Sequence, residues 1–241
     1  MRITLTLAIG MFAASLFAQT SIQKKFQAQK GQELTLKFDY PQLVKITTWD
    51  KNEIEISGKV DINNNQNNGD FVISEQKLAG NTKLIEGKVT NYKDLPQHVV
   101  AYKGDDKITF KSKKEFQEYE KANKTKFDIT SIGVQIDIVL EIKVPRNTKT
   151  LIESTYGTVE VNTFDGPLVA KSTYGSVDAT IDQKKVGELN AECFYGKIFT
   201  NLDLPVKPTK SEDFHTVITA YNGKEPRQEF SSKYGNVYLR K

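Results

Sequence analysis

The chain has 241 residues, of which 34 are basic and 30 acidic, and it contains one cysteine, Cys193. A charge balance this even argues against a nucleic-acid-binding protein, in which basic residues gather on one face. A single cysteine excludes a disulfide bond within the chain, so packing and backbone hydrogen bonds must supply the stability.

The first eighteen residues are typical of a secretory signal peptide. Arg2 gives a positive start, residues 3–17 form an apolar run too short to span a membrane, and Ala18 offers a small residue for cleavage. Leu16 at the minus-three position leaves the cleavage point less well defined, and an uncleaved N-terminal anchor is the alternative. We expect an exported protein of the periplasm or cell surface of a bacterium, not integral to a membrane.

Residues 19–145 are predicted to form a strand-rich N-terminal region. Apolar and polar residues alternate through Leu34, Leu36 and Phe38, and again from Val134 to Val144. Alternation with period two and many β-branched residues is typical of half-buried strands.

An insertion is predicted at about 90–130 within this region. The segment 111–124 (KSKKEFQEYEKANK) favours a short exposed helix with Phe116 and Tyr119 on one face. Its lysines either contact an acidic partner or form a solvated face, and three interleaved glutamates favour the solvated face.

Residues 146–241 repeat a short motif. It reads STYGTV from Ser154, STYGSV from Ser172, CFYGKI from Cys193 and SKYGNV from Ser232. Its tyrosines are 18, 21 and 39 residues apart, so a degenerate fifth copy is expected near Phe214 in the last interval. The recurring structural positions are Tyr156, Gly157, Tyr174, Gly175, Tyr195, Gly196, Tyr234 and Gly235.

The repeat predicts an all-β fold. Apolar residues alternate before the glycine, and the alternation shifts by one residue after it, as expected at a bend where glycine adopts backbone angles that other residues avoid. One strand before and one after each corner, stacked copy on copy, gives a single-stranded parallel β-solenoid, or β-helix, with coils of about 20 residues. We expect five coils in chain order. Gly175→Val should unfold or strongly destabilise the protein, because it forces a β-branched residue into a geometry that only glycine adopts.

The tyrosine column has two interpretations. Stacked rings brace neighbouring coils, which is the favoured interpretation, or an exposed aromatic ladder binds sugar rings. Cys193 occupies a column of small residues and is expected to be a buried, unreactive thiol.

No catalytic, cofactor-binding or metal-binding residue is predicted. His98 and His215 are far apart and match no ligand spacing. The enzymatic alternative is a polysaccharide-acting β-helix enzyme that uses Glu160 and Asp178, which share a column on consecutive coils. These carboxylates are expected to be solvent-exposed, with no loops around them that form a cleft.

At the STYGTV and STYGSV copies, the chain resembles a bacterial "putative adhesin" family of unknown function, whose exported members carry such repeats on a β-solenoid. The likeness extends upstream to Val144–Pro145 and to residues 46–56. The resemblance implies a surface or periplasmic role and no defined ligand. Together with the absence of a catalytic motif, it leads us to expect a non-catalytic adhesin-like protein that binds or scaffolds the cell envelope, with an envelope protein or a glycan among the partners considered. Similar proteins also occur beside envelope regulators, so a periplasmic component of an envelope-signalling system is the alternative.

Overall fold

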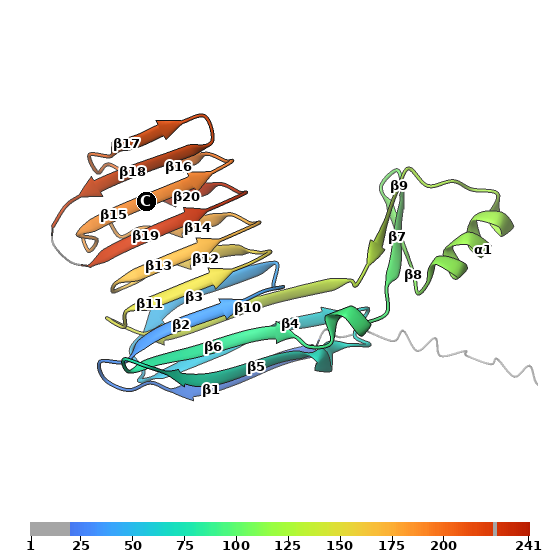
Figure 1. The fold of residues 1–241 in the computed structure, drawn as a ribbon, viewed down its shortest axis with the longest axis horizontal. Helices are drawn as coiled ribbons and strands as arrows, with labels where there is room; N and C mark the ends of the chain where they lie inside the picture. The colour runs from blue at the N-terminus through green and yellow to red at the C-terminus, as the bar shows by residue number, and fades with distance from the viewer. Residues whose placement is uncertain (1–19, 224–225) are drawn as a thin grey trace, which may run out of the picture.

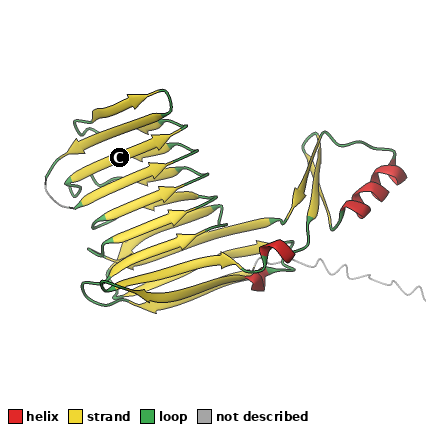
Figure 2. Ribbon diagram, viewed as in Figure 1, coloured by secondary structure: helices red, strands yellow, loops and turns green. Residues whose placement is uncertain are grey.

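The structure is a computed structural model that describes residues 20–223 and 226–241. The predicted signal peptide, residues 1–18, lies outside the described residues. Strands dominate the described part of the chain, which contains a single α-helix and three sheets (Figures 1 and 2). The protein is therefore all-β, as the alternation of its sequence predicts.

Two large sheets face each other across one hydrophobic core. In spatial order, the first sheet consists of β1 (Thr20–Gln27), β4 (Glu53–Ile62), β10 (Ile136–Pro145), β3 (Leu43–Trp49), β12 (Thr158–Asn162), β14 (Val177–Thr180), β20 (Val237–Arg240) and β16 (Ile198–Thr200). The second consists of β17 (Lys207–Glu212), β18 (His215–Tyr221), β15 (Glu188–Phe194), β19 (Arg227–Ser232), β13 (Leu168–Ser172), β11 (Thr150–Ser154), β2 (Glu33–Phe38), β6 (Thr82–Val89) and β5 (Phe71–Leu78).

Each copy of the repeat contributes one strand to each large sheet. In the second sheet, β11, β13, β19 and β15 are parallel neighbours in register, and in the first sheet β12, β14, β20 and β16 are. The coil that carries Tyr234 therefore lies between the coils of Tyr174 and Tyr195. The expected chain order of the coils is wrong, because the last repeat is inserted between the second and third copies of the motif.

Side-chain size explains this insertion. Phe230 of the last repeat is fully buried, and its register partners on the two neighbouring strands are Ala170 and Ala191. A large side chain between two alanines fills the interior, whereas two adjacent alanine layers would leave space, and voids are costly in a protein core.

The predicted fifth coil does not form. Residues 207–221 instead make an antiparallel hairpin, in which β17 pairs with β18, and β18 pairs with β15. His215 stands where the other copies have glycine, and the coil-to-coil approach at the corner has no room for a β-carbon. With β1, β4 and β5 also in antiparallel pairs, both large sheets are mixed rather than single-stranded and parallel.

A coil that the sequence pattern did not reveal precedes the four copies of the motif. Strands β2 and β3 pair in parallel with β11 and β12. At the corner between them, Phe38 replaces the small residue, Tyr40 keeps the tyrosine, and Pro41 replaces the glycine. Because both the small residue and the glycine are replaced, this copy does not match the motif.

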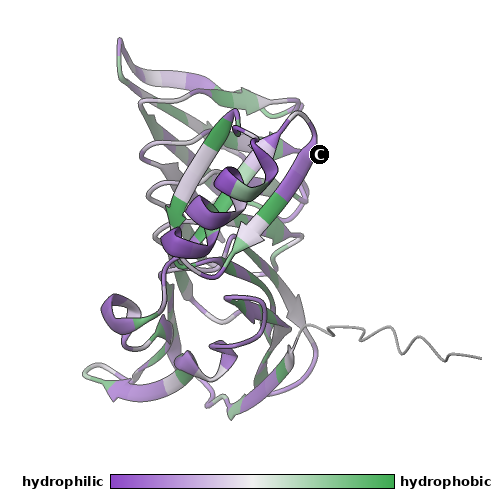
Figure 3. Cartoon of the chain, turned by 90° about the vertical axis from the view of Figure 1, so that its right-hand side faces the viewer, coloured by the Kyte–Doolittle hydropathy of each residue, from purple (hydrophilic) through white to green (hydrophobic). Residues whose placement is uncertain are grey.

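The insertion forms a separate small unit. Strands β8 (Asp106–Phe110), β7 (His98–Lys103) and β9 (Ile129–Gly133) make an antiparallel sheet, and α1 (Lys113–Asn123) lies within the segment for which a helix is predicted. A small core around Phe110 lies between sheet and helix. No residue of α1 is buried, and Figure 3 shows its hydrophilic surface in front of the sheet. Two short 3-10 turns, η1 (Asn68–Asp70) and η2 (Tyr92–Asp94), complete the described elements.

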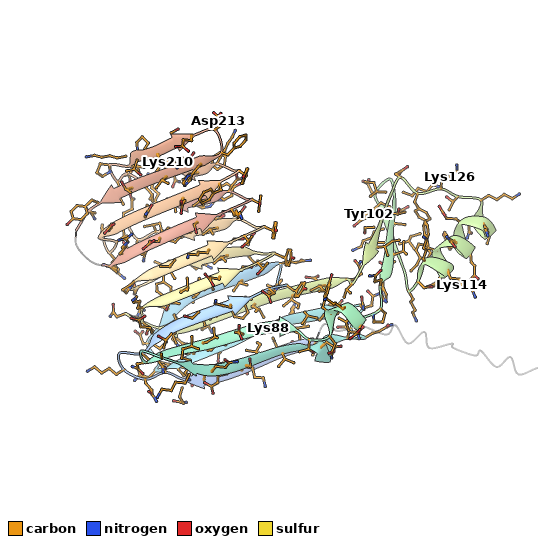
Figure 4. All side chains as sticks on the ribbon, in the orientation of Figure 1. Lys88, Tyr102, Lys114, Lys126, Lys210 and Asp213 are labelled. Atoms are coloured by element: carbon orange, nitrogen blue, oxygen red, sulfur yellow. The ribbon has the colours of Figure 1, made fainter. Side chains whose placement is uncertain are left out.

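The far end of the stack is covered. Beyond β15 the hairpin β17–β18 extends the second sheet, and Leu202, Leu204 and Val206 pack against the core. The edge strand β17 carries Lys207, Pro208 and Lys210, and Figure 4 shows Lys210 and Asp213 on this terminal hairpin. Charged side chains and proline on an edge strand discourage pairing with another sheet.

Candidate functional site

The tyrosines of the repeat form one continuous ladder of stacked rings. They lie in the corners between the two large sheets, directly after β11, β13, β19 and β15. The ring centres are 5.2 Å apart for Tyr156–Tyr174, 5.1 Å for Tyr174–Tyr234 and 5.2 Å for Tyr234–Tyr195, with interplanar angles of 6–12°. The structure thus brings together all four tyrosines of the motif.

Three further rings, all outside the motif, extend the ladder. Tyr40 of the first coil stacks on Tyr156 at 5.6 Å, and Tyr92 of η2 stacks on Tyr40 at 4.8 Å. At the other end, Phe214 of the hairpin lies 5.6 Å from Tyr195. The spacing of the motif indicated Phe214 as a member of the tyrosine column, whereas Tyr40 and Tyr92 carry no such signal because one lacks the glycine and the other lies outside any coil.

The ladder is exposed along one edge. About half of each of the side chains Tyr156 (55%), Tyr174 (54%) and Tyr234 (46%) is accessible to solvent, although neighbouring rings cover their faces. Solvent therefore meets ring edges and phenol hydroxyls. Burial, with Tyr92, Tyr156 and Asp39 close by, raises the pKa of the less exposed Tyr40 above its ordinary value of 10.0.

A second ladder, of hydrogen bonds, fixes the corners below the rings. The Ser172 hydroxyl donates to the carbonyl of Gly157 (2.8 Å) and accepts from the amide of Gly175 (2.9 Å). Ser232 repeats this pattern with the Gly175 carbonyl (2.8 Å) and the Gly235 amide (2.9 Å). Ser172 and Ser232 therefore each tie their own corner to the neighbouring coil, whereas the Ser154 hydroxyl, among the described residues, bonds only to the Gly157 amide of its own corner.

Cys193 takes the place of serine in this ladder. Its side chain is buried, and its thiol donates to the carbonyl of Gly235 at 3.1 Å. Burial raises the pKa of the Cys193 thiol, although hydrogen bonds from the Gly196 and Val237 amides oppose that effect. The thiol thus has the structural position and the donor role that serine has in two of the other copies.

Close approach between coils, and not an unusual backbone angle, requires glycine at the corners. A β-carbon added to Gly175 would lie 2.3 Å from the carbonyl oxygen of Gly157, and one added to Gly235 would lie 2.3 Å from that of Gly175. None of the four corner glycines has a positive φ, whereas Tyr195 does, at 53°. The expectation that these glycines adopt angles closed to other residues is therefore wrong.

The two carboxylates of the enzymatic alternative are register neighbours on the outer face of the first sheet. Each has a basic partner of its own. Asp178 accepts two hydrogen bonds from Arg240, at 2.7 and 2.8 Å, while Glu160 lies 3.9 Å from the Lys45 ammonium.

The two histidines lie in different parts of the molecule. His215 of β18 contacts Glu192 at 2.6 Å and stacks on Phe194 at 4.0 Å, whereas His98 is buried in β7 of the insertion. Within residues 20–223 and 226–241, no group of three or more histidine, cysteine, aspartate or glutamate side chains is arranged to hold a metal ion. Among the same residues, no helix is long and apolar enough to cross a membrane.

The ladder lies on the side of the stack that faces the insertion. In Figure 1 the arrows of β11, β13 and β19 point toward the insertion, so the corners that follow these strands lie at that edge. Figure 3, which looks from that side, shows the insertion in front of the stack, and Figure 4 shows Tyr102 of β7 on the side of the insertion nearer to it.

Comparison with known proteins shows no family for this chain. No family model matches it, and no curated protein does. Two solved structures are similar to it: a "putative cell adhesion protein" from Clostridium sporogenes (8% identity, TM-score 0.44, 92% of this chain and 99% of that one) and a "putative adhesin" from Parabacteroides merdae (10% identity, TM-score 0.23, 92% and 96%). At these TM-scores neither the fold nor the function of this chain follows from the two structures.

Proposed function

We propose that this chain is an exported, non-catalytic, adhesin-like β-solenoid that binds or scaffolds a component of the bacterial cell envelope. The observation that carries the proposal is the aromatic ladder, which runs the length of the stack and is open to solvent along one edge. Aromatic rings that present a polar tip are typical of binding surfaces. The sequence motif and the leader support the adhesin-like assignment and the export.

In-register parallel pairing supports a solenoid for the stacked part of the fold. Five coils, each with one strand in either sheet, follow one another from β2/β3 to β15/β16. Such a stack is stiff along its axis because backbone ladders bond each coil to the next, and Ser172 and Ser232 add side-chain hydrogen bonds between coils at two of the corners. A stiff array is suited to hold a binding surface at a fixed geometry.

The charges on the outer face support a non-catalytic role. A general acid needs a carboxyl group whose surroundings favour the protonated form. Instead, each carboxylate has a basic partner: Asp178 accepts two hydrogen bonds from Arg240, and Glu160 lies 3.9 Å from the Lys45 ammonium. This pairing makes the polysaccharide-cleaving alternative the weaker one.

The covered end favours a side surface over end-to-end stacking. The C-terminal coil is inside the stack, and the outermost strand of the second sheet carries lysines and a proline. The ladder is an exposed side surface at which a partner can bind.

Sedimentation with isolated envelopes tests the proposal. The purified chain from residue 19 is mixed with envelopes of the producing bacterium and centrifuged. In parallel, cell fractionation and N-terminal sequencing locate the native protein and its cleavage site. We expect the protein in the envelope or periplasmic fraction and in the pellet with envelopes. Cytoplasmic location, or a protein that stays in the supernatant, would contradict the proposal.

A further inference from the structure

We infer that the tyrosine ladder binds a neutral polysaccharide chain that lies along the stack axis. This inference rests on the proposed function and adds a ligand class to it. It follows from which side-chain and backbone groups of the corners are free to contact a ligand.

At the corners, side chains are available to a ligand, whereas the backbone amides of the tyrosines are already hydrogen-bonded. The amides of Tyr174 and Tyr234 donate to the carbonyls of Thr155 and Thr173 on the neighbouring coil, both at 2.9 Å. The Tyr195 amide donates to Phe214 at 3.0 Å. A peptide that adds itself as a strand needs free backbone groups. Coil-to-coil bonding uses them here, which argues against a peptide ligand.

The phenol hydroxyls are free to bind. Within the part of the chain that the structure describes, no hydrogen bond engages the hydroxyls of Tyr156, Tyr174, Tyr195 or Tyr234. Each hydroxyl both donates and accepts. The ring centres repeat at 5.1–5.2 Å along the motif. The row of hydroxyls can therefore form hydrogen bonds with a ligand that is itself a repeating polymer.

The strip of residues beside the rings carries few charges. Thr155 and Thr173 precede the tyrosines, and Thr158, Ser176 and Asn236 follow the glycines. Three charged residues lie along it: Asp39 in the first coil, Lys233, whose ammonium lies 5.3 Å from the centre of the Tyr234 ring, and Lys197 in the last coil. An anionic polymer or a nucleic acid needs a row of cations. Two lysines do not make such a row, whereas the phenol hydroxyls and the exposed ring edges match a neutral sugar chain.

Packing alone does not account for the ladder's full length. Tyr92 and Phe214 belong to no coil, yet both lie against the terminal tyrosines and leave 38% and 65% of their side chains exposed. They continue the surface beyond the five coils. A longer row adds contacts of the same kind, and linked contacts raise avidity steeply.

Affinity electrophoresis is the test. The mature protein runs through native gels that contain a neutral extended polymer (hydroxyethyl cellulose, arabinoxylan or galactomannan) or an anionic one (alginate or polygalacturonate). We expect at least one neutral polymer to retard it. With oligosaccharides cut from that polymer, calorimetry should show affinity that rises from disaccharide to hexasaccharide.

Three phenylalanine substitutions isolate the hydroxyls. The variant Y156F/Y174F/Y234F keeps the ring stack and removes the hydroxyls, so its thermal melting should be unchanged while affinity falls at least about tenfold. Y221F is the matched control, because Tyr221 is 62% exposed outside the ladder. Equal affinity for the triple variant and the native protein would overturn the inference.

The remaining outcomes separate this inference from the proposed function. Retardation by anionic polymers alone, or by none of the polymers, overturns the ligand class. If the protein still pellets with envelopes in that case, the proposed function stands and only its ligand is wrong. If it does neither, both proposals fail.

Discussion

The Ser232 hydroxyl donates a hydrogen bond to the carbonyl of Gly175, which lies 57 residues earlier in the chain, at 2.8 Å. This contact forms because the final repeat is inserted beside the second copy of the motif. The last strand, β20, pairs on one side with β14 and on the other with β16. The coil β15/β16 and the terminal hairpin therefore gain their full support only when the C-terminal strands are in place.

Phe230→Ala should cost about 3–5 kcal/mol of unfolding free energy, because Phe230 fills the space between two alanine layers. Chemical denaturation followed by far-UV circular dichroism measures the loss. Phe214→Ala is the comparison. That ring is 65% exposed, so its removal should lower the free energy of unfolding much less. Similar losses in the two variants would mean that Phe230 does not hold the inserted coil.

Gly175→Ala should destabilise the protein by about 3 kcal/mol, within the upper range for overpacked cores. The added β-carbon would lie 2.3 Å from the Gly157 carbonyl oxygen, so the coils must separate locally. Gly69→Ala is the matched control, because nothing lies within 4 Å of its added carbon and its φ is not positive. Equal denaturation midpoints for the two variants would contradict the close approach of the coils.

The sequence pattern predicts the strands and corners of this fold but not the order in which its coils stack. Every copy of the motif offers the same small residue, tyrosine and glycine, so backbone pairing is equally favourable in any order. The sizes of Ala170, Ala191 and Phe230 decide the order, and they act only once the copies are stacked. The first coil does not match the motif, because Phe38 and Pro41 replace its small residue and its glycine.

The candidate site was predictable to a similar extent. The motif supplied four rings of the ladder, and the spacing suggested Phe214. Tyr92 joins through a 3-10 turn whose position depends on the path of β6, which no local pattern specifies. Exposure of the ring edges likewise follows from the corner geometry and not from the periodicity of the chain.

Cys193 should react with a thiol reagent at least about 100-fold more slowly in the folded protein than in the unfolded protein, because it is buried and its pKa is raised. Absorbance with an aromatic disulfide reagent, with and without denaturant, measures both rates. Cys193→Ser should keep the native stability to within about 1 kcal/mol, since serine occupies this column in the neighbouring coils. Rapid labelling of the folded protein would contradict the buried ladder position.

His98 should make the insertion sensitive to acid. It is buried, its Nδ1 has no hydrogen-bond partner among the described residues, and burial lowers its pKa below the ordinary value of 6.5. Glu115 opposes this shift and Lys111 adds to it. Because the folded state holds this proton less tightly than the unfolded state does, stability is full above pH 6.5 and falls as the pH drops toward the lowered pKa.

Thermal melting of the native chain and of His98→Phe between pH 7.5 and pH 5 measures this dependence. Carboxylates also titrate at the acid end, so the informative quantity is the difference between the two proteins. We expect the native chain to lose more stability than the variant as the pH falls below 6.5. His215→Gln is the control, because it removes the other histidine, which lies outside the insertion, and leaves His98 in place, so the loss that His98 causes should persist. Parallel pH profiles for the native chain and His98→Phe would mean that His98 is not held neutral in the folded insertion.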